Sequence, residues 1–353
     1  MGNRRCEQSV RSGGGTLGGG LGRGAIGMAV LALLICMAVS LCIGRYPLRG
    51  RMLLDWLAAV VSGGGGDRVV SRIMVDIRLP RILIAVFAGG ALSVAGAAYQ
   101  GIFRNPMASP DVLGVSAGAG FGAALGILLS LPAPLVQLVS FAFGILAVGA
   151  SVLIAWAAGR HQNMTLVLVL SGMMVSSLFS AFISLVKYLA DPNSQLPEIT
   201  YWLMGSFSAV TKDSLLPAFV SGLAAFVPLM LLRWRINLLT FGDEEARAMG
   251  VNTAAIRAAA IGCATLLTAS VVSIGGQIGW IGLVIPHLAR MMAGPNYLTL
   301  LPLSLLTGGI GLLVVDTVAR SLIQIELPLS ILTAVIGAPF FVFLLIRKRK
   351  GWT

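Results

Sequence analysis

The segment GDEEARAMG, residues 242–250, places four charges within five positions of a chain that is otherwise dominated by apolar side chains. Apolar residues make up 57% of the chain and charged residues only 11%. Because each charge at the middle of a bilayer costs about 2.5 to 3.5 kcal/mol, the segment is expected to lie outside the membrane. Gly242 and Asp243 suit the start of a helix, Gly250 suits its end, and Asn252 suits the cap of the next one. The sequence therefore predicts a short polar helix between two membrane spans, with a solvated turn as the alternative.

The overall composition agrees with this placement. The mean hydropathy is +0.92 over 353 residues, of which 44 are glycine, which excludes a soluble globular domain and indicates a polytopic helical membrane protein. The net charge of +12 is spread over the loops, which is ordinary for a membrane protein whose cytoplasmic segments are held inside by positive charge. Lipid is therefore expected around the chain, and nucleic acid is not expected as a partner.

About ten apolar stretches are candidate transmembrane helices, which predicts an all-α polytopic fold. The eighth, 278–293, is short, and merging it with the seventh would make nine spans. They lie near residues 25–44, 82–103, 112–131, 135–158, 165–187, 214–232, 256–274, 278–293, 301–320 and 328–346.

An even number of spans puts both ends of the chain on one side, and both ends are basic, so both termini are predicted to be cytoplasmic. Residues 1–23 are glycine-rich and basic and are expected to form a disordered tail. Residues 24–347 form the membrane domain, and residues 348–353 form a cytoplasmic C-terminus. Within the domain, residues 45–80 are interpreted as an external loop and residues 233–254 as the cytoplasmic segment around GDEEARAMG.

The predicted outer side carries an unexpected excess of arginine. Seven of its ten basic residues lie between Arg45 and Arg81, ending in the sequence RLPR. Arg78 and Arg81 either reach lipid headgroups or dock acidic groups of an external partner. Arg320 is a third candidate, although Asp316 is placed to be its i,i+4 partner.

Two motifs bear on catalysis and energy supply. Residues 114–118 match G-x-S-x-G, but no strand precedes Ser116, and small residues at this spacing are typical of close helix packing in bilayers. None of the four lysines belongs to a phosphate-loop motif, and no metal-ligand cluster is visible, so uphill transport would take energy from a partner or a coupled ion. The charges gather at span ends, which favours a partner over an ion-coupled secondary transporter. An intramembrane serine hydrolase is the remaining alternative.

Six segments together resemble the FecCD, or cobalamin-type, permeases of ATP-binding-cassette (ABC) importers. They are RLPR (78–81), NPMASPDVLGVSAGA (105–119), YWLMGSFS (201–208), GDEEARAMGV (242–251), GGQIGWIGLVIPHLAR (275–290) and ELPLSILTAVIGAPFFVFLL (326–345).

The resemblance implies a type II importer fold and a homodimer in the bacterial inner membrane. It also implies two cytoplasmic ATPase subunits, which bind the ATP and magnesium, and a periplasmic substrate-binding protein. The permease itself would perform no catalysis and bind no cofactor directly. The expected cargo is an iron-siderophore, haem or cobalamin, and an oxyanion such as molybdate is not separable from these by the permease residues.

The resemblance also assigns residues. It places Arg78, Arg81 and Arg320 at the docking site of the binding protein. In the helix after residue 164, we expect pathway residues at Ser171, Met174, Ser177 and Ser180. The segment that couples to the ATPase would comprise Gly242, Asp243, Glu244, Glu245, Ala246, Arg247, Ala248, Met249 and Gly250.

Overall fold

All regular elements of the described residues are helices. The structure, a computed structural model, describes residues 17–44, 56, 58, 67–158 and 164–348. The elements are α2 (Leu17–Cys42), α4 (Arg68–Arg72), η1 (Ile73–Arg78), α5 (Leu79–Ile102), η2 (Pro110–Leu113), α6 (Val115–Leu128), α7 (Ala133–Ala158), α8 (Met164–Leu189), α9 (Gln195–Leu203), α10 (Lys212–Leu239), α11 (Asp243–Ala248), α12 (Thr253–Gly275), α13 (Ile281–Ala293), α14 (Tyr297–Ser321) and α15 (Leu329–Lys348).

Each of the ten predicted spans corresponds to a helix. Seven helices of the described residues are long and apolar enough to cross a membrane, and α6, α13 and α15 provide three shorter apolar segments. A helix of 14 residues, such as α6, is only about 21 Å long, which is less than the roughly 30 Å of hydrocarbon. Backbone that is not α-helical precedes α6 at residues 103–114, which include the 3-10 turn η2, and precedes α13 at residues 276–280. Such backbone is tolerated at membrane depth where protein encloses it.

Two boundaries differ from the sequence-based expectation. α2 begins at Leu17, inside the stretch expected to be a disordered tail, and residues 1–16 lie outside the described residues. The second span begins at Arg68 rather than near residue 82, so the described part of the expected loop 45–80 from residue 68 onward is helical. The π-helical turn η1 explains the continuity: Leu79 N–H donates to the Met74 carbonyl just before Pro80, where the missing N–H would interrupt an α-helical pattern.

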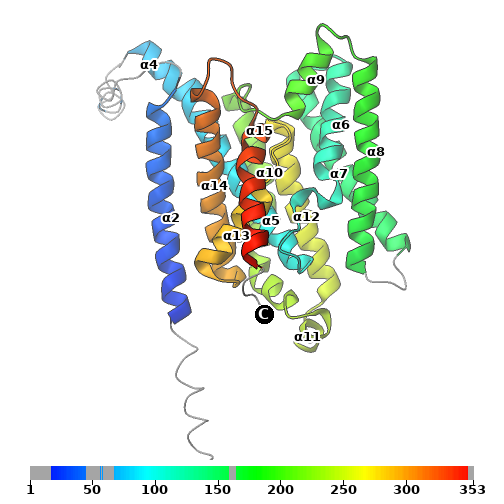
Figure 1. Cartoon of the computed structure of the whole chain (residues 1–353). Coiled ribbons are helices and arrows are strands. Elements are labelled where there is room, and N and C mark those ends of the chain that lie inside the picture. Colours follow the sequence, from blue (N-terminus) through cyan, green and yellow to red (C-terminus); the bar gives the residue numbers. More distant parts are fainter. Residues whose placement is uncertain (1–16, 45–55, 57, 59–66, 159–163, 349–353) are drawn as a thin grey trace, which may run out of the picture.

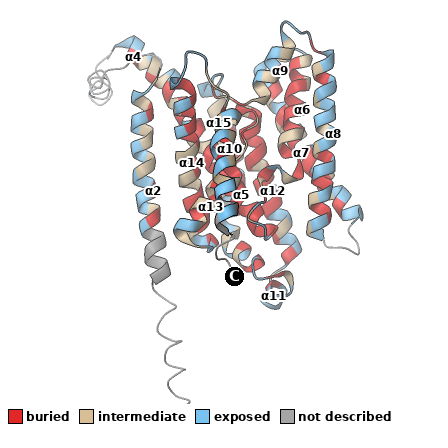
Figure 2. Ribbon diagram, in the orientation of Figure 1, coloured by how far each residue is buried: buried red, intermediate tan, exposed pale blue. Residues whose placement is uncertain are grey.

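The centre of the molecule is α5. In its most apolar window 83% of the residues are buried, against 17% in α2, and Figure 2 shows exposed residues along α2 and α8 at the two edges. α5 crosses α14 with backbone in direct contact: a Cβ added at Gly89 would lie 2.1 Å from the Gly308 carbonyl oxygen. Small residues at the crossing therefore allow the close helix packing that membranes favour.

The two predicted charged regions lie at opposite ends of the bundle. Figure 1 shows α11 projecting at one end, together with the end of α15 and the described start of α2, whereas α4 and α9 lie at the other end. This arrangement places residues 242–250 outside the spans, as the sequence predicts.

Candidate functional site

The segment 242–250 forms the short helix α11, as the sequence predicts, and its caps are those expected. Gly242 precedes it with φ +135°, a conformation that side chains rarely adopt. Gly250 ends it with φ +79°. There, Gly250 N–H donates to Arg247 O and Val251 N–H donates to Ala246 O, the hydrogen bonds of a Schellman motif. Asn252 then caps α12, because its side chain accepts from Ala255 N–H at 3.1 Å.

The acidic residues of α11 divide into two groups. Glu244 and Glu245 are exposed. Asp243, in contrast, accepts two hydrogen bonds from Arg257 of α12, at 2.9 and 3.2 Å. Burial alone would raise the pKa of Asp243, but these hydrogen bonds and the nearby charges of Arg257, Arg104 and Arg247 hold it below its ordinary value. Of the three acidic residues of α11, only Glu244 and Glu245 are thus exposed.

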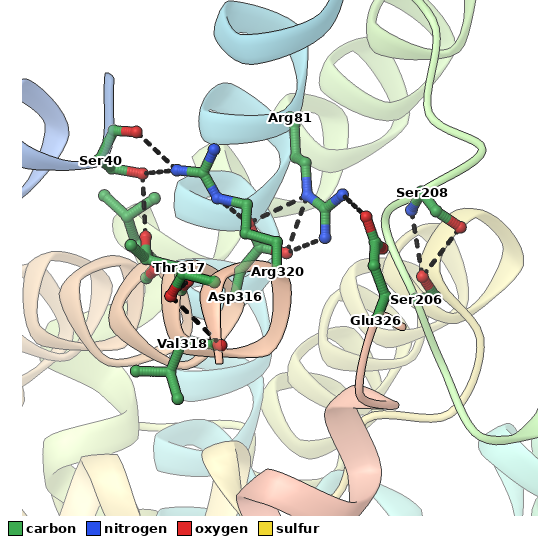
Figure 3. A network of polar contacts seen from close by, with 11 residues as sticks. Ser40, Arg81, Ser206, Ser208, Asp316, Thr317, Val318, Arg320 and Glu326 are labelled. Carbon is green, nitrogen blue, oxygen red and sulfur yellow. Dashed lines mark hydrogen bonds and ion pairs between the residues drawn. The ribbon is translucent and has the colours of Figure 1, made fainter. Parts of the chain in front are cut away.

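At the opposite end, three arginines and two carboxylates form a cluster that we call the arginine cluster: Arg78, Arg81, Asp316, Arg320 and Glu326. Figure 3 shows Arg81 between the two carboxylates, with its Nη2 2.9 Å from Asp316 and its Nη1 2.8 Å from Glu326. The Nε of Arg320 lies 3.8 Å from the same Asp316, which confirms the i,i+4 pairing anticipated from the sequence.

The cluster also holds the end of α2. Arg320 donates to the carbonyl and the hydroxyl oxygen of Ser40, each at 2.6 Å, and Arg78 donates to the carbonyls of Leu41 and Cys42. Cations near the C-terminus of a helix are stabilising because they meet its unpaired carbonyls.

The three arginines expected to dock a partner are therefore buried. Their relative exposures are 4% for Arg78, 8% for Arg81 and 6% for Arg320, and all three interact with groups of their own chain. They line an open pocket of about 320 Å³ together with Gly44, Ile73, Ile77 and Glu326. The structure thus brings the three arginines together, as expected, and their docking role stays a prediction.

The four expected pathway residues do not share one environment. Ser171 is buried and donates to Val167 O within α8. Met174, Ser177 and Ser180 are exposed in the single chain. A spacing of three residues rotates about 60° per step around an α-helix, so Ser171 and Ser180 lie on opposite sides of α8. Ser171 therefore does not share the exposed environment of Met174, Ser177 and Ser180.

The G-x-S-x-G segment has contacts typical of packing. Ser116 of α6 donates to Asp111, and a Cβ added at Gly118 would lie 2.5 Å from Ala147 Cβ of α7. His161, one of the chain's two histidines, lies outside the described residues.

Sequence reasoning missed Glu326 and Arg257 as partners of the charged regions. Arg81 and Glu326 are 245 residues apart, and Asp243 and Arg257 are 14 apart on two different helices, so no local spacing relates them. The one sequence feature that could have drawn attention to Glu326 is its place at the start of ELPLS, a segment that carries the family resemblance.

Comparison with known proteins places this geometry in a family. The FecCD transport family matches residues 32–347. The molybdate import permease of Haemophilus influenzae is 42% identical over 91% of this chain and 95% of its own length, and the Fe(3+) dicitrate permease of Escherichia coli is 39% identical over 90% and 97%. A solved inward-facing metal-chelate type ABC transporter superposes with a TM-score of 0.82 at 39% identity, covering 91% of this chain and 98% of that one. The chain is therefore a multi-pass membrane protein of the FecCD transport family, the permease subunit of an ABC importer.

Proposed function

We propose that this chain forms one half of a homodimeric permease in the bacterial inner membrane, with α11 facing the cytoplasm and the arginine cluster facing the periplasm. The observation that carries the proposal is that α11, with the exposed acids Glu244 and Glu245, lies at one end of the bundle, while Arg78 of the arginine cluster ends the turn η1 that follows α4 at the other end. α15 ends at Lys348 at the α11 end, the sequence there is basic (residues 347–350), and the positive-inside rule supports a cytoplasmic location for that end.

At the cytoplasmic end, two ATPase subunits would bind ATP and magnesium and contact the exposed face of α11. This face includes Glu244, Glu245, Arg247 and the half-exposed Met249. At the periplasmic end, a substrate-binding protein would deliver the cargo beside the arginine cluster. Because the arginines are buried in the single chain, docking of acidic groups would require part of the cluster to change partners.

The mechanism follows from this two-ended arrangement. Closure of the ATPases on ATP displaces α11, the two halves of the dimer rock, and a central cavity opens alternately to each side. Exposed Met174, Ser177 and Ser180 of α8 would face that cavity. The permease residues perform no chemistry on the cargo, and the chain binds no cofactor of its own.

The cargo is proposed to be an iron-siderophore or a related metal chelate, as for the ferric dicitrate relative. Molybdate is the second candidate, because the molybdate permease of Haemophilus influenzae matches this chain over nearly its full length.

The test is reconstitution of the chain with its cognate ATPase and binding protein in proteoliposomes. Uptake of a ferric siderophore, haem, cobalamin and molybdate is measured with and without internal ATP. We expect a stoichiometric complex and ATP-dependent uptake of one of these compounds. Uptake driven by an ion gradient without ATP would instead indicate a secondary transporter. Loss of activity in Ser116→Ala, with an intact complex, would favour a hydrolase.

A further inference from the structure

Side-chain contacts join α11 to the helix that follows it. Asp243 is paired with Arg257, whose side chain is only 13% exposed, and the Nε of Arg247 donates to Thr253 Oγ1 at 3.3 Å. Ala246 of α11 is fully buried against Ile256 of α12, with Leu239 of α10 completing the small cluster. Among the described residues, the polar side-chain contacts of α11 with other helices go to α12, and α10 supplies an apolar neighbour.

The two segments that connect α11 to α12 and to α10 also differ in how firmly hydrogen bonds fix them. The junction with α12 is fixed by the Schellman hydrogen bonds at Gly250 and Val251, and then by the Asn252 cap. The junction with α10 passes through Gly242 at φ +135°, where no side-chain cap is formed. Both junctions contain a glycine at positive φ, so the difference lies in the contacts: the Asp243–Arg257 ion pair and the Asn252 cap are on the α12 side, and they hold α11 to α12 more firmly than to α10.

The far end of α12 leads to the arginine cluster. Ser206 N–H donates to Gly275 O, the last carbonyl of α12, at 2.9 Å. The carbonyl of Gly205, one residue earlier, accepts from Leu329 N–H at 2.9 Å. A Cβ added at Gly276 would lie 2.2 Å from Trp202 O, so these backbones are packed without space to slide.

The segment that receives this contact continues into the cluster. Leu329 lies three residues after Glu326, and Glu326 pairs with Arg81. Between them, Leu327 N–H donates to Ala319 O of α14. A continuous series of hydrogen bonds and close contacts therefore connects α11 with the arginine cluster through α12.

We propose that Arg257 is a positioning residue: its ion pair with Asp243 fixes α11 to α12 as one rigid unit, so that α12 transmits movement between the ATPase end and the arginine cluster. The proposal rests on the proposed function, because it assumes that a partner moves α11. It adds the specific residue pair and helix through which the two ends are coupled.

The first experiment examines the ion pair in the full chain without partners. In a background in which the four native cysteines are replaced, spin labels are placed at the exposed Ala248 of α11 and Ala258 of α12, and the distribution of distances between them is measured in nanodiscs. We expect a narrow distribution that broadens in Arg257→Gln and narrows again when Asp243→Arg is combined with Arg257→Asp. An equally narrow distribution in Arg257→Gln would overturn the proposal.

The second experiment measures coupling in the assembled importer, as the ratio of ATP hydrolysis with the binding protein to hydrolysis without it. Arg257→Gln should lower this ratio roughly tenfold, within the range that single residues of a coupled network produce, while the charge-swapped pair restores it. Asp213→Asn, at an exposed acid of α10 far from α11, is the matched control and should keep the ratio. Arg257→Lys retains the charge and serves if Arg257→Gln does not fold.

The two experiments distinguish a failure of the proposed function from a failure of the role assigned to Arg257. If the unchanged chain recovers no ATPase, the proposed function fails, while the spin-label experiment still reports on the ion pair. If the complex assembles and the ratio is the same in Arg257→Gln as in the unchanged chain, the function stands and the role of Arg257 is refuted.

Discussion

The α11 end and the arginine cluster carry comparable numbers of charges, but they use them in opposite ways. In α11, Glu244 and Glu245 are exposed and only Asp243 is paired within the chain. In the arginine cluster, all three arginines are buried and interact with carboxylates or carbonyls of the same chain. Charge in a predicted loop therefore does not by itself indicate a contact surface, because a loop that folds into a helix can bury its charges as ion pairs.

The difference has an energetic consequence. Exposed charges contribute about 0 to 1 kcal/mol each to stability and are available to a partner. Breaking a buried pair leaves an uncompensated charge and is strongly destabilising. Substitutions in the arginine cluster should therefore affect folding first, and substitutions on the exposed face of α11 should affect assembly first.

The largest effect is expected for Asp316→Ala. Asp316 is fully buried and contacts both Arg81 and Arg320, so its removal leaves two buried guanidinium groups without this carboxylate. The free energy of unfolding should fall by about 3 to 5 kcal/mol, measured by thermal and denaturant unfolding in detergent.

The matched control is Asp76→Ala, because Asp76 pairs with Arg72 and Lys212 but is 43% exposed. Its loss should cost about 1 kcal/mol or less. Equal losses for the two variants would show that the arginine cluster is not a buried network.

A smaller loss is expected for Gly242→Ala. At φ +135° a side chain strains the backbone, and the added Cβ would lie 2.1 Å from the Glu245 carboxylate, which can move aside. The expected cost is about 1 to 3 kcal/mol. Gly262→Ala is the control, since nothing lies within 4 Å of its Cβ position in α12, and this substitution should be neutral or stabilising. Equal changes in the free energy of unfolding for the two variants would show that the backbone at Gly242 does not require glycine.

Reversal of the exposed acids, Glu244→Arg with Glu245→Arg, should change the free energy of unfolding by only about 0.5 kcal/mol. Recovery of the ATPase during affinity purification should nevertheless be lost, because the exposed face of α11 then presents the opposite charge. Undiminished recovery would remove α11 from the ATPase interface.

The smallest effect concerns pH. The pKa of Asp243 is held below its ordinary value of 3.8, so the stabilisation from its ion pair is fully present above that value and is lost as pH falls through the lower, folded-state pKa. The difference in melting temperature between the unchanged chain and Asp243→Asn should be constant from pH 8 to 5 and should shrink only in stronger acid. A difference that already shrinks at pH 6 would contradict the pairing with Arg257.

The helical membrane fold, the ten apolar segments and the position of α11 with its caps could all be predicted from the sequence. These features depend on local quantities, namely the apolar content of about 20 consecutive residues and the backbone preferences of Gly242, Gly250 and Asn252. Only the folded chain reveals that α5 lies at the centre, that the arginines near the start of α5 are buried, and that Asp243 pairs with Arg257. Those outcomes depend on partners far apart along the chain, such as Arg81 with Asp316 and Glu326, whose meeting is set by helix packing and not by sequence spacing.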